Sequence, residues 1–109
     1  TGYTDIVFNP VSIFRLSEII GNLIEKEVGG ILNIGSTYSI SKAEFINSIA
    51  NFIDKYYEGL TFGLQPTLTI KRPKNTTLNL SRSRALGLKE IDLGEDLHST
   101  ILFYNNQNI

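Results

Sequence analysis

The chain has 109 residues, of which 41% are hydrophobic and 19% charged, and its formal net charge is -1. This length suits one domain, and the composition excludes a disordered segment and a long apolar membrane span. Near-neutral charge provides no overall field for nucleic acid or an anionic membrane. We therefore expect no nucleic-acid partner and no membrane partner. With no cysteine and a single histidine, we also expect no disulfide framework and no metal site.

The N-terminal residues, TGYTDIVF, lack the basic region followed by an apolar region that marks a signal peptide. A cytoplasmic location is therefore expected. The sequence starts at Thr1 in what resembles the middle of a fold, and it contains no methionine. These two features favour a piece of a longer protein.

The first third of the chain predicts a strand, a helix and a second strand. Residues 5–8, DIVF, predict a short extended segment before a turn at Asn9-Pro10, where proline disfavours the helical conformation of the residue before it. A helix is expected over residues 14–28, ended by Gly29-Gly30. Its apolar residues recur at helical spacing: Leu16, Ile19, Ile20, Leu23 and Ile24. Residues 30–35, GILNIG, are typical of a strand buried on both faces.

A helix start signal follows this second strand. Ser41 with Glu44 three residues later forms a capping box, and Ile40 and Phe45 have the spacing of a hydrophobic staple. The core face expected for this helix consists of Phe45, Ile49, Phe52, Ile53 and Tyr56.

The second half predicts one more strand and two helices. Residues 67–73 alternate as a strand that Pro73 ends, Ser81 can cap a short helix that ends at Gly87, and Asp92 can cap the last helix. The predicted fold class is mixed α/β with α+β character, a small sheet of two to three strands with three to four helices in a single domain, 1–109. So thin a sheet usually needs neighbours, which again favours a piece of a larger fold.

Tyr38 and Lys42 have the YxxxK spacing of the catalytic pair in short-chain dehydrogenases. In such a pair, lysine lowers the phenol pKa only when both residues lie on one helical face. The capping box makes Lys42 the first helical residue, so Tyr38 is expected in the preceding turn. No GxGxxG motif is present to hold a dinucleotide. We therefore predict no catalytic residue and no cofactor-binding residue in this chain.

Half of the ten basic residues fall within the fourteen positions 71–84, KRPKNTTLNLSRSR. They are Lys71, Arg72, Lys74, Arg82 and Arg84. A guanidinium held on an extended segment can bind a phosphate through two hydrogen bonds, and neighbouring hydroxyl groups can complete an anion site. Composition alone leaves open the alternative of a solvated basic loop.

Several segments, in this order and spacing, resemble the C-terminal part of dTDP-4-dehydrorhamnose reductases and related extended short-chain dehydrogenases acting on nucleotide sugars. That family shows xPTYVxDLAxAI, GIYHVGSxxxxSKYEFA and RPxxSxLDxSKxxxLGI in succession. The matching positions are Asn9-Pro10 with Leu16, Gly30 to Ser36, Ser41-Lys42 with Glu44-Phe45, and Arg72-Pro73 with Leu78, Ser81 and Leu86-Gly87. The resemblance covers nearly all of Phe8 to Ile101. Asn79 and Arg15 depart from it, each standing where the family often has Asp.

The resemblance implies the substrate-binding C-terminal region of an enzyme that reduces a 4-keto nucleotide sugar with NAD(P)H. The cofactor and the catalytic tyrosine would belong to a missing N-terminal Rossmann domain, the partner of this region, and no cofactor would bind to this piece alone. By the same resemblance, Arg72 is the candidate for the nucleotide diphosphate, Lys74 and Asn75 are weaker candidates, and the segment Asn9 to Ser12 lines the sugar cleft. A sugar epimerase or dehydratase, or a noncatalytic regulatory subunit of the same fold, remains open.

Overall fold

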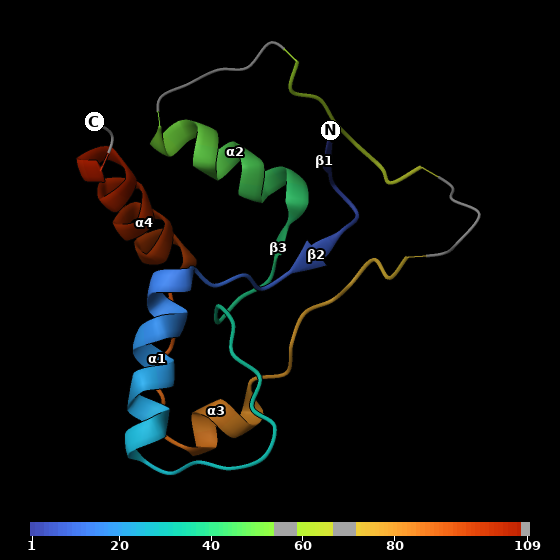
Figure 1. Cartoon of the computed structure of the whole chain (residues 1–109). Helices are drawn as coiled ribbons and strands as arrows, with labels where there is room; N and C mark the ends of the chain where they lie inside the picture. Colours follow the sequence, from blue (N-terminus) through green and yellow to red (C-terminus); the bar gives the residue numbers. More distant parts are fainter. Residues whose placement is uncertain (54–58, 67–71, 108–109) are drawn as a thin grey trace. The chain divides into compact units, whose positions relative to one another are not determined.

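The structure is a computed structural model that describes residues 1–53, 59–66 and 72–107. The chain divides into two compact units, one made of Thr1–Asn9 and Ser39–Thr77, the other of Pro10–Tyr38 and Leu78–Ile109. Four helices and two small sheets confirm the small mixed α/β fold class (Figure 1). The assignment of residues 1–109 to one substrate-binding domain remains a prediction.

The first unit holds all the strands of the described residues. β1 (Gly2–Tyr3) pairs in parallel with β4 (Phe62–Gly63), and β2 (Val7–Phe8) pairs antiparallel with β3 (Ile40–Ser41). The helix of this unit, α2 (Lys42–Phe52), contacts β1. Here Gly2 is required by close approach, because a Cβ atom on it would lie only 3.0 Å from the Cα atom of Ala43.

The predicted start of α2 is confirmed. The buried Ser41 hydroxyl accepts a hydrogen bond of 3.1 Å from the Glu44 amide, and Glu44 places a negative charge in the first turn. Phe45 then contacts the ring of Phe8 edge-on, with 5.3 Å between the ring centroids. Of the predicted core face, Phe52 is 41% exposed, and Tyr56 lies outside the described residues.

The second unit contains α1 (Ile13–Glu25), α3 (Ser81–Ala85) and α4 (Leu93–Gln107). The buried side chains Ile19, Ile91 and Ile101 form its core. Helix α1 ends at Glu25, three residues before the predicted end, because a Schellman motif closes it. The Glu27 amide bonds the Ile24 carbonyl and the Val28 amide bonds the Leu23 carbonyl, with Glu27 itself at φ 52.

The prediction for α3 was wrong in its cap and right in its end. The residue before the helix is Leu80, and the Asn79 side chain accepts bonds from the amide and the hydroxyl of Ser81 at 2.9 and 2.5 Å. The Asn79 carboxamide, one residue before the N-cap position of Leu80, thus accepts hydrogen bonds from two donors of Ser81 at the helix start. Gly87, at φ 75, ends the helix as expected. Helix α4 begins beside Asp92, whose carboxylate accepts the Glu95 amide at 3.3 Å.

The predicted strand over residues 30–35 is not formed. No strand is assigned there, and Ile31 is 87% exposed rather than buried. A strand requires a neighbour that supplies main-chain partners. Among residues 1–53, 59–66 and 72–107, the main-chain groups of this segment accept hydrogen bonds only from side chains of α3. Most of the other predicted strand, residues 67–71 of 67–73, lies outside the described residues. None of the helices described is long and apolar enough to cross a bilayer.

Candidate functional site

The predicted anion-binding segment, Arg72 to Asn75, runs beside strand β2 in the first unit. The Val7 amide donates to the Lys74 carbonyl at 2.8 Å, and the Thr76 amide donates back to the Val7 carbonyl at 3.0 Å. Asn75 and Val7 thus form a parallel bridge. The main chain holds this segment in place, so its side chains project from a fixed backbone.

Asp5, two residues before Val7, holds the side chain of Lys74 in place. Its carboxylate accepts the Gln65 amide at 2.9 Å and lies 3.5 Å from the Lys74 ammonium group. The Gln65 hydrogen bond is the largest cause that holds the pKa of Asp5 below its usual value. Desolvation opposes it, and the Asp5 amide and Lys74 lower the pKa further with smaller effects. Asp5 therefore stays ionised at neutral pH and positions Lys74.

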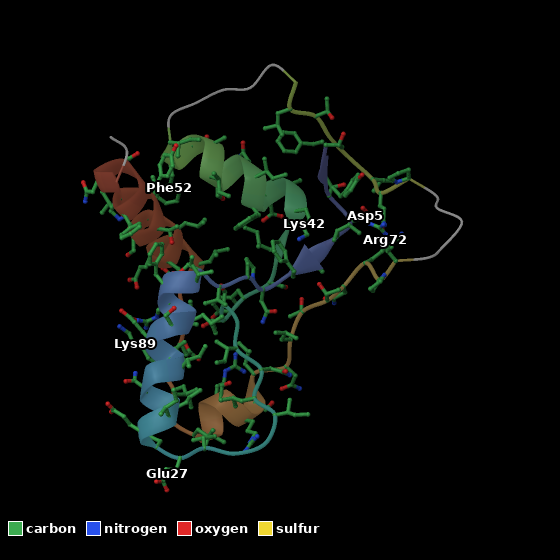
Figure 2. The ribbon with its side chains drawn as sticks, in the orientation of Figure 1. Asp5, Glu27, Lys42, Phe52, Arg72 and Lys89 are labelled. Atoms are coloured by element: carbon green, nitrogen blue, oxygen red, sulfur yellow. The ribbon has the colours of Figure 1, made fainter. Side chains whose placement is uncertain are left out.

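Arg72 differs from Lys74 in having no ion pair. Its side chain is exposed, and its guanidinium meets no hydrogen-bond partner among the described parts of the chain. Figure 2 shows Arg72 labelled on the segment that returns toward the strands of the first unit. A guanidinium without a carboxylate partner keeps all five donors for an incoming anion.

Asn75 contributes a polar group next to these cations. Its side-chain oxygen accepts the Thr77 amide at 3.0 Å, which closes an Asx turn. The carboxamide nitrogen of Asn75 has no acceptor among residues that the structure describes. It remains a donor at the surface of the segment.

Lys42 is a further cation beside β2 that sequence reasoning assigned only to a helix start. Its amide donates to the Ile6 carbonyl at 2.8 Å, and its ammonium lies 3.6 Å from the centroid of the Phe8 ring (Figure 2). No signal in the sequence predicted this contact of Lys42, because it depends on the pairing of β2 with β3. The ammonium group lies over a ring, and no carboxylate of the described residues forms an ion pair with it.

The two residues predicted for the sugar cleft belong to different units. Asn9 is buried in the first unit, at 6% exposure. Ser12 caps α1 in the second unit, where its hydroxyl accepts the Arg15 amide at 3.1 Å. The amide and hydroxyl of Ser12 donate to the Asp96 carboxylate at 2.7 and 2.5 Å. Its role toward a substrate stays a prediction.

The remaining basic residues of the predicted cluster belong to the second unit and have partners there. Arg82 donates to the carbonyls of Gly29 and Ile31, and Arg84 lies 3.6 Å from Glu90. Lys71 lies outside the described residues. A cluster that is continuous in sequence is therefore divided between two units. Of its described members, Arg72 is the one with neither a hydrogen bond nor an ion pair to another described residue.

Tyr38 and Lys42 do not share a helical face. Tyr38 lies in the turn before α2 and is 82% exposed, whereas Lys42 is the first residue of the helix. This confirms the turn predicted from the capping box. Within the described residues, no group of three or more His, Cys, Asp or Glu side chains could hold a metal ion.

Comparison with known proteins gives a relation at the level of fold. No protein-family profile matches the sequence, and no curated protein matches it. Among solved structures, the chain is similar to dTDP-4-dehydrorhamnose reductase from Bacillus anthracis, crystallised in complex with NADP, with a TM-score of 0.76 and 19% identity. The match covers 94% of this chain and 37% of the reductase chain. This chain therefore has the fold of a part of that NADP-binding reductase, spanning about a third of its length.

Proposed function

We propose that this chain is the substrate-binding region of a nucleotide-sugar reductase, active in a longer protein and not catalytic on its own. The observation that carries the proposal is the fold match over 94% of the chain to a dTDP-4-dehydrorhamnose reductase. The chain carries an exposed Arg72 that has no ion partner among the described residues, on a segment hydrogen-bonded to β2. This is the type of group that binds a diphosphate.

In this proposal, the guanidinium of Arg72 binds the diphosphate of the nucleotide sugar with two parallel hydrogen bonds. Lys74, held by Asp5 at 3.5 Å, adds positive charge, and the carboxamide nitrogen of Asn75 donates a hydrogen bond. Asn9, in the same unit as Arg72, lines the side of the site where the sugar binds. Ser12, in the second unit, stays a candidate substrate contact on the sequence resemblance alone.

The cofactor belongs to another part of the longer protein in this proposal. The 109 residues contain no glycine-rich dinucleotide motif, so they do not fit NAD(P) as a binding site. When bound to that other part, NAD(P)H supplies the hydride that reduces a 4-keto sugar. The residues of this chain bind and orient the nucleotide sugar.

The experiment measures nucleotide-sugar binding by calorimetry in the complete gene product. Arg72→Ala is expected to weaken binding about tenfold or more, because a hydrogen bond to a charged group contributes roughly 1.5 to 3 kcal/mol. Arg72→Lys should restore only part of this affinity, since lysine lacks the planar fork. Arg84→Ala is the matched control, because Arg84 lies in the second unit beside Glu90. Unchanged affinity of Arg72→Ala would remove Arg72 from the site.

The sequence preceding this region distinguishes the proposal from its alternatives. A GxGxxG motif after a first strand, with a YxxxK pair inside a helix, supports the enzyme. Loss of that Tyr or Lys would support a noncatalytic binding subunit. Product analysis with a 4-keto sugar and NAD(P)H then separates a reductase from an epimerase or dehydratase.

A further inference from the structure

Lys42 holds a positive charge at a place in the first unit that disfavours one. It is the first residue of α2, at the end of the helix where the backbone dipole is positive. Its side chain is half-buried, and no carboxylate among the described residues forms an ion pair with it. A cation that is partly removed from water without a counter-charge raises the free energy of the folded state. An anion bound beside Lys42 would compensate this charge.

The Phe8 ring fixes the position of the Lys42 charge. The Lys42 ammonium lies 3.6 Å from the ring centroid, and Phe45 packs edge-on against the same ring at 5.3 Å. The Lys42 amide donates to the Ile6 carbonyl at 2.8 Å, which extends the pairing of β2 with β3 and holds the backbone of Lys42 in place. A ring face attracts an ammonium group from one side only, so the N–H donors on its other side remain available for phosphate oxygens.

Strand β2 lies between Lys42 and the segment that carries Arg72. Ser41 pairs with Val7 on one side of this strand, and Asn75 bridges Val7 on the other side. Since neighbouring strands lie about 4.8 Å apart, the backbones on the two sides are separated by about 10 Å. Figure 2 shows Lys42 at the start of α2 and Arg72 beyond the other side of β2. Two long basic side chains can span this separation together with the two phosphate groups of a diphosphate.

The unpaired charges of the first unit match those of a nucleoside diphosphate sugar. The basic side chains described in this unit are Lys42, Arg72 and Lys74. Lys74 lies 3.5 Å from the Asp5 carboxylate, whereas Lys42 and Arg72 have no ion pair to a described residue. Two positive charges are thus available to a ligand, and the diphosphate of a nucleotide sugar carries two negative charges. A nucleoside monophosphate sugar carries one, which would leave one of the two cations unpaired.

We propose that Lys42 binds one phosphate group of the diphosphate and Arg72 the other, so that the two cations select nucleoside diphosphate sugars over monophosphate sugars. The inference rests on the proposed function, to whose site it adds a residue from α2. Lys42 acts as a compact point charge, whereas the Arg72 guanidinium contacts its phosphate through two hydrogen bonds.

Calorimetric titration of the complete gene product tests the inference with the nucleoside diphosphates dTDP, UDP and GDP and with the matching monophosphates. Lys42→Met should weaken binding of the preferred diphosphate about fivefold or more, because it removes a hydrogen bond between charged groups. Lys42→Arg keeps the charge and should stay within about threefold of the wild type. Lys89→Met changes an exposed lysine of the second unit and is the matched control, which should leave the affinity unchanged.

The monophosphates show whether the two cations bind separate phosphate groups. Only one of Lys42→Met and Arg72→Ala should weaken binding of the monophosphate, since that ligand has a single phosphate group. Unchanged diphosphate affinity in Lys42→Met would overturn the inference, and so would equal losses of monophosphate affinity in both variants. A purely structural role of Lys42 would also overturn it, because Lys42→Met would then lower the melting temperature and weaken both ligands alike.

The same titrations separate this inference from the proposed function. A wild-type protein that binds none of these nucleotides would overturn the proposed function. Loss of diphosphate binding in Arg72→Ala but not in Lys42→Met would overturn only the inference about Lys42.

Discussion

The contact between Ser12 and Asp96 allows a quantitative test of how the second unit is held together. Asp96 on α4 accepts the amide and the hydroxyl of Ser12 at 2.7 and 2.5 Å, and Ser12 caps α1 through the Arg15 amide at 3.1 Å. The carboxylate thus ties the first turn of α4 to the N-terminus of α1, where negative charge is favourable. We expect Asp96→Ala to be more destabilising than Ser12→Ala.

The magnitude follows from the bonds that each substitution removes. Asp96→Ala removes two hydrogen bonds to a charged group and leaves the Ser12 amide without its acceptor, which should cost about 2 to 3 kcal/mol after allowance for partial exposure. Ser12→Ala removes the cap and one of those bonds but keeps the bond from the amide, for a cost of about 1.5 kcal/mol. The two effects share one bond, so the double variant should fall about 1 kcal/mol short of the sum.

Urea unfolding followed by circular dichroism of the four proteins measures these differences. Additive effects, or an Asp96→Ala cost below about 0.5 kcal/mol, would refute the reasoning. Nucleotide-sugar affinity measured on the same variants also tests the predicted substrate role of Ser12. A loss of affinity in Ser12→Ala that Asp96→Ala does not share would indicate that Ser12 contacts the sugar directly.

Three further predictions use local features of the chain. Glu27→Gly should raise stability by about 1 kcal/mol in urea unfolding, because Glu27 has φ 52, while Glu27→Ala should not. Folding lowers the pKa of Asp5, so the ionised carboxylate stabilises the fold above the unfolded pKa. This stabilisation is lost as the pH falls below about 4. Asp5→Asn should remove this pH dependence of stability in acid titrations monitored by circular dichroism. Arg82→Lys should destabilise nearly as much as Arg82→Ala, about 1 kcal/mol, since one ammonium cannot span the two carbonyls that Arg82 binds; equal stability of wild type and Arg82→Lys would contradict this.

Local signals in the sequence predicted the parts of the fold that depend on neighbouring residues. Ser41 caps α2, Asp92 caps α4 and Gly87 ends α3, because each acts within a few residues of its own position. The end of α1 was misplaced because Glu27 adopts a conformation that usually selects glycine. The strand at residues 30–35 was wrong in this chain because a strand depends on a partner that periodicity does not supply.

The candidate site shows the same division between local and long-range information. Position in the sequence predicted Arg72 and Lys74 as neighbours, but only the pairing of Val7 with Asn75 brings Asp5 within 3.5 Å of Lys74. Lys42 was missed because its contact with Phe8 depends on the register of β2 and β3. No sequence signal distinguished the neutralised Lys74 from the unpaired Arg72.

Several large apolar side chains lack cover within the described residues. The buried hydrophobic residues of the described chain are Ile19, Ala43, Ile91 and Ile101, whereas Ile13, Ile24, Ile31 and Leu64 are each more than two thirds exposed. Covering a large aliphatic side chain contributes roughly 1.5 to 3 kcal/mol, so these exposed residues represent stabilisation that the described residues alone do not obtain. Large exposed apolar side chains are a usual mark of a protein interface when they gather on one surface. We therefore expect Ile31→Asp to lower the melting temperature of the complete protein, whereas Ile31→Val should not. Arg72→Ala, in the other unit, should lower nucleotide-sugar affinity and leave the melting temperature unchanged.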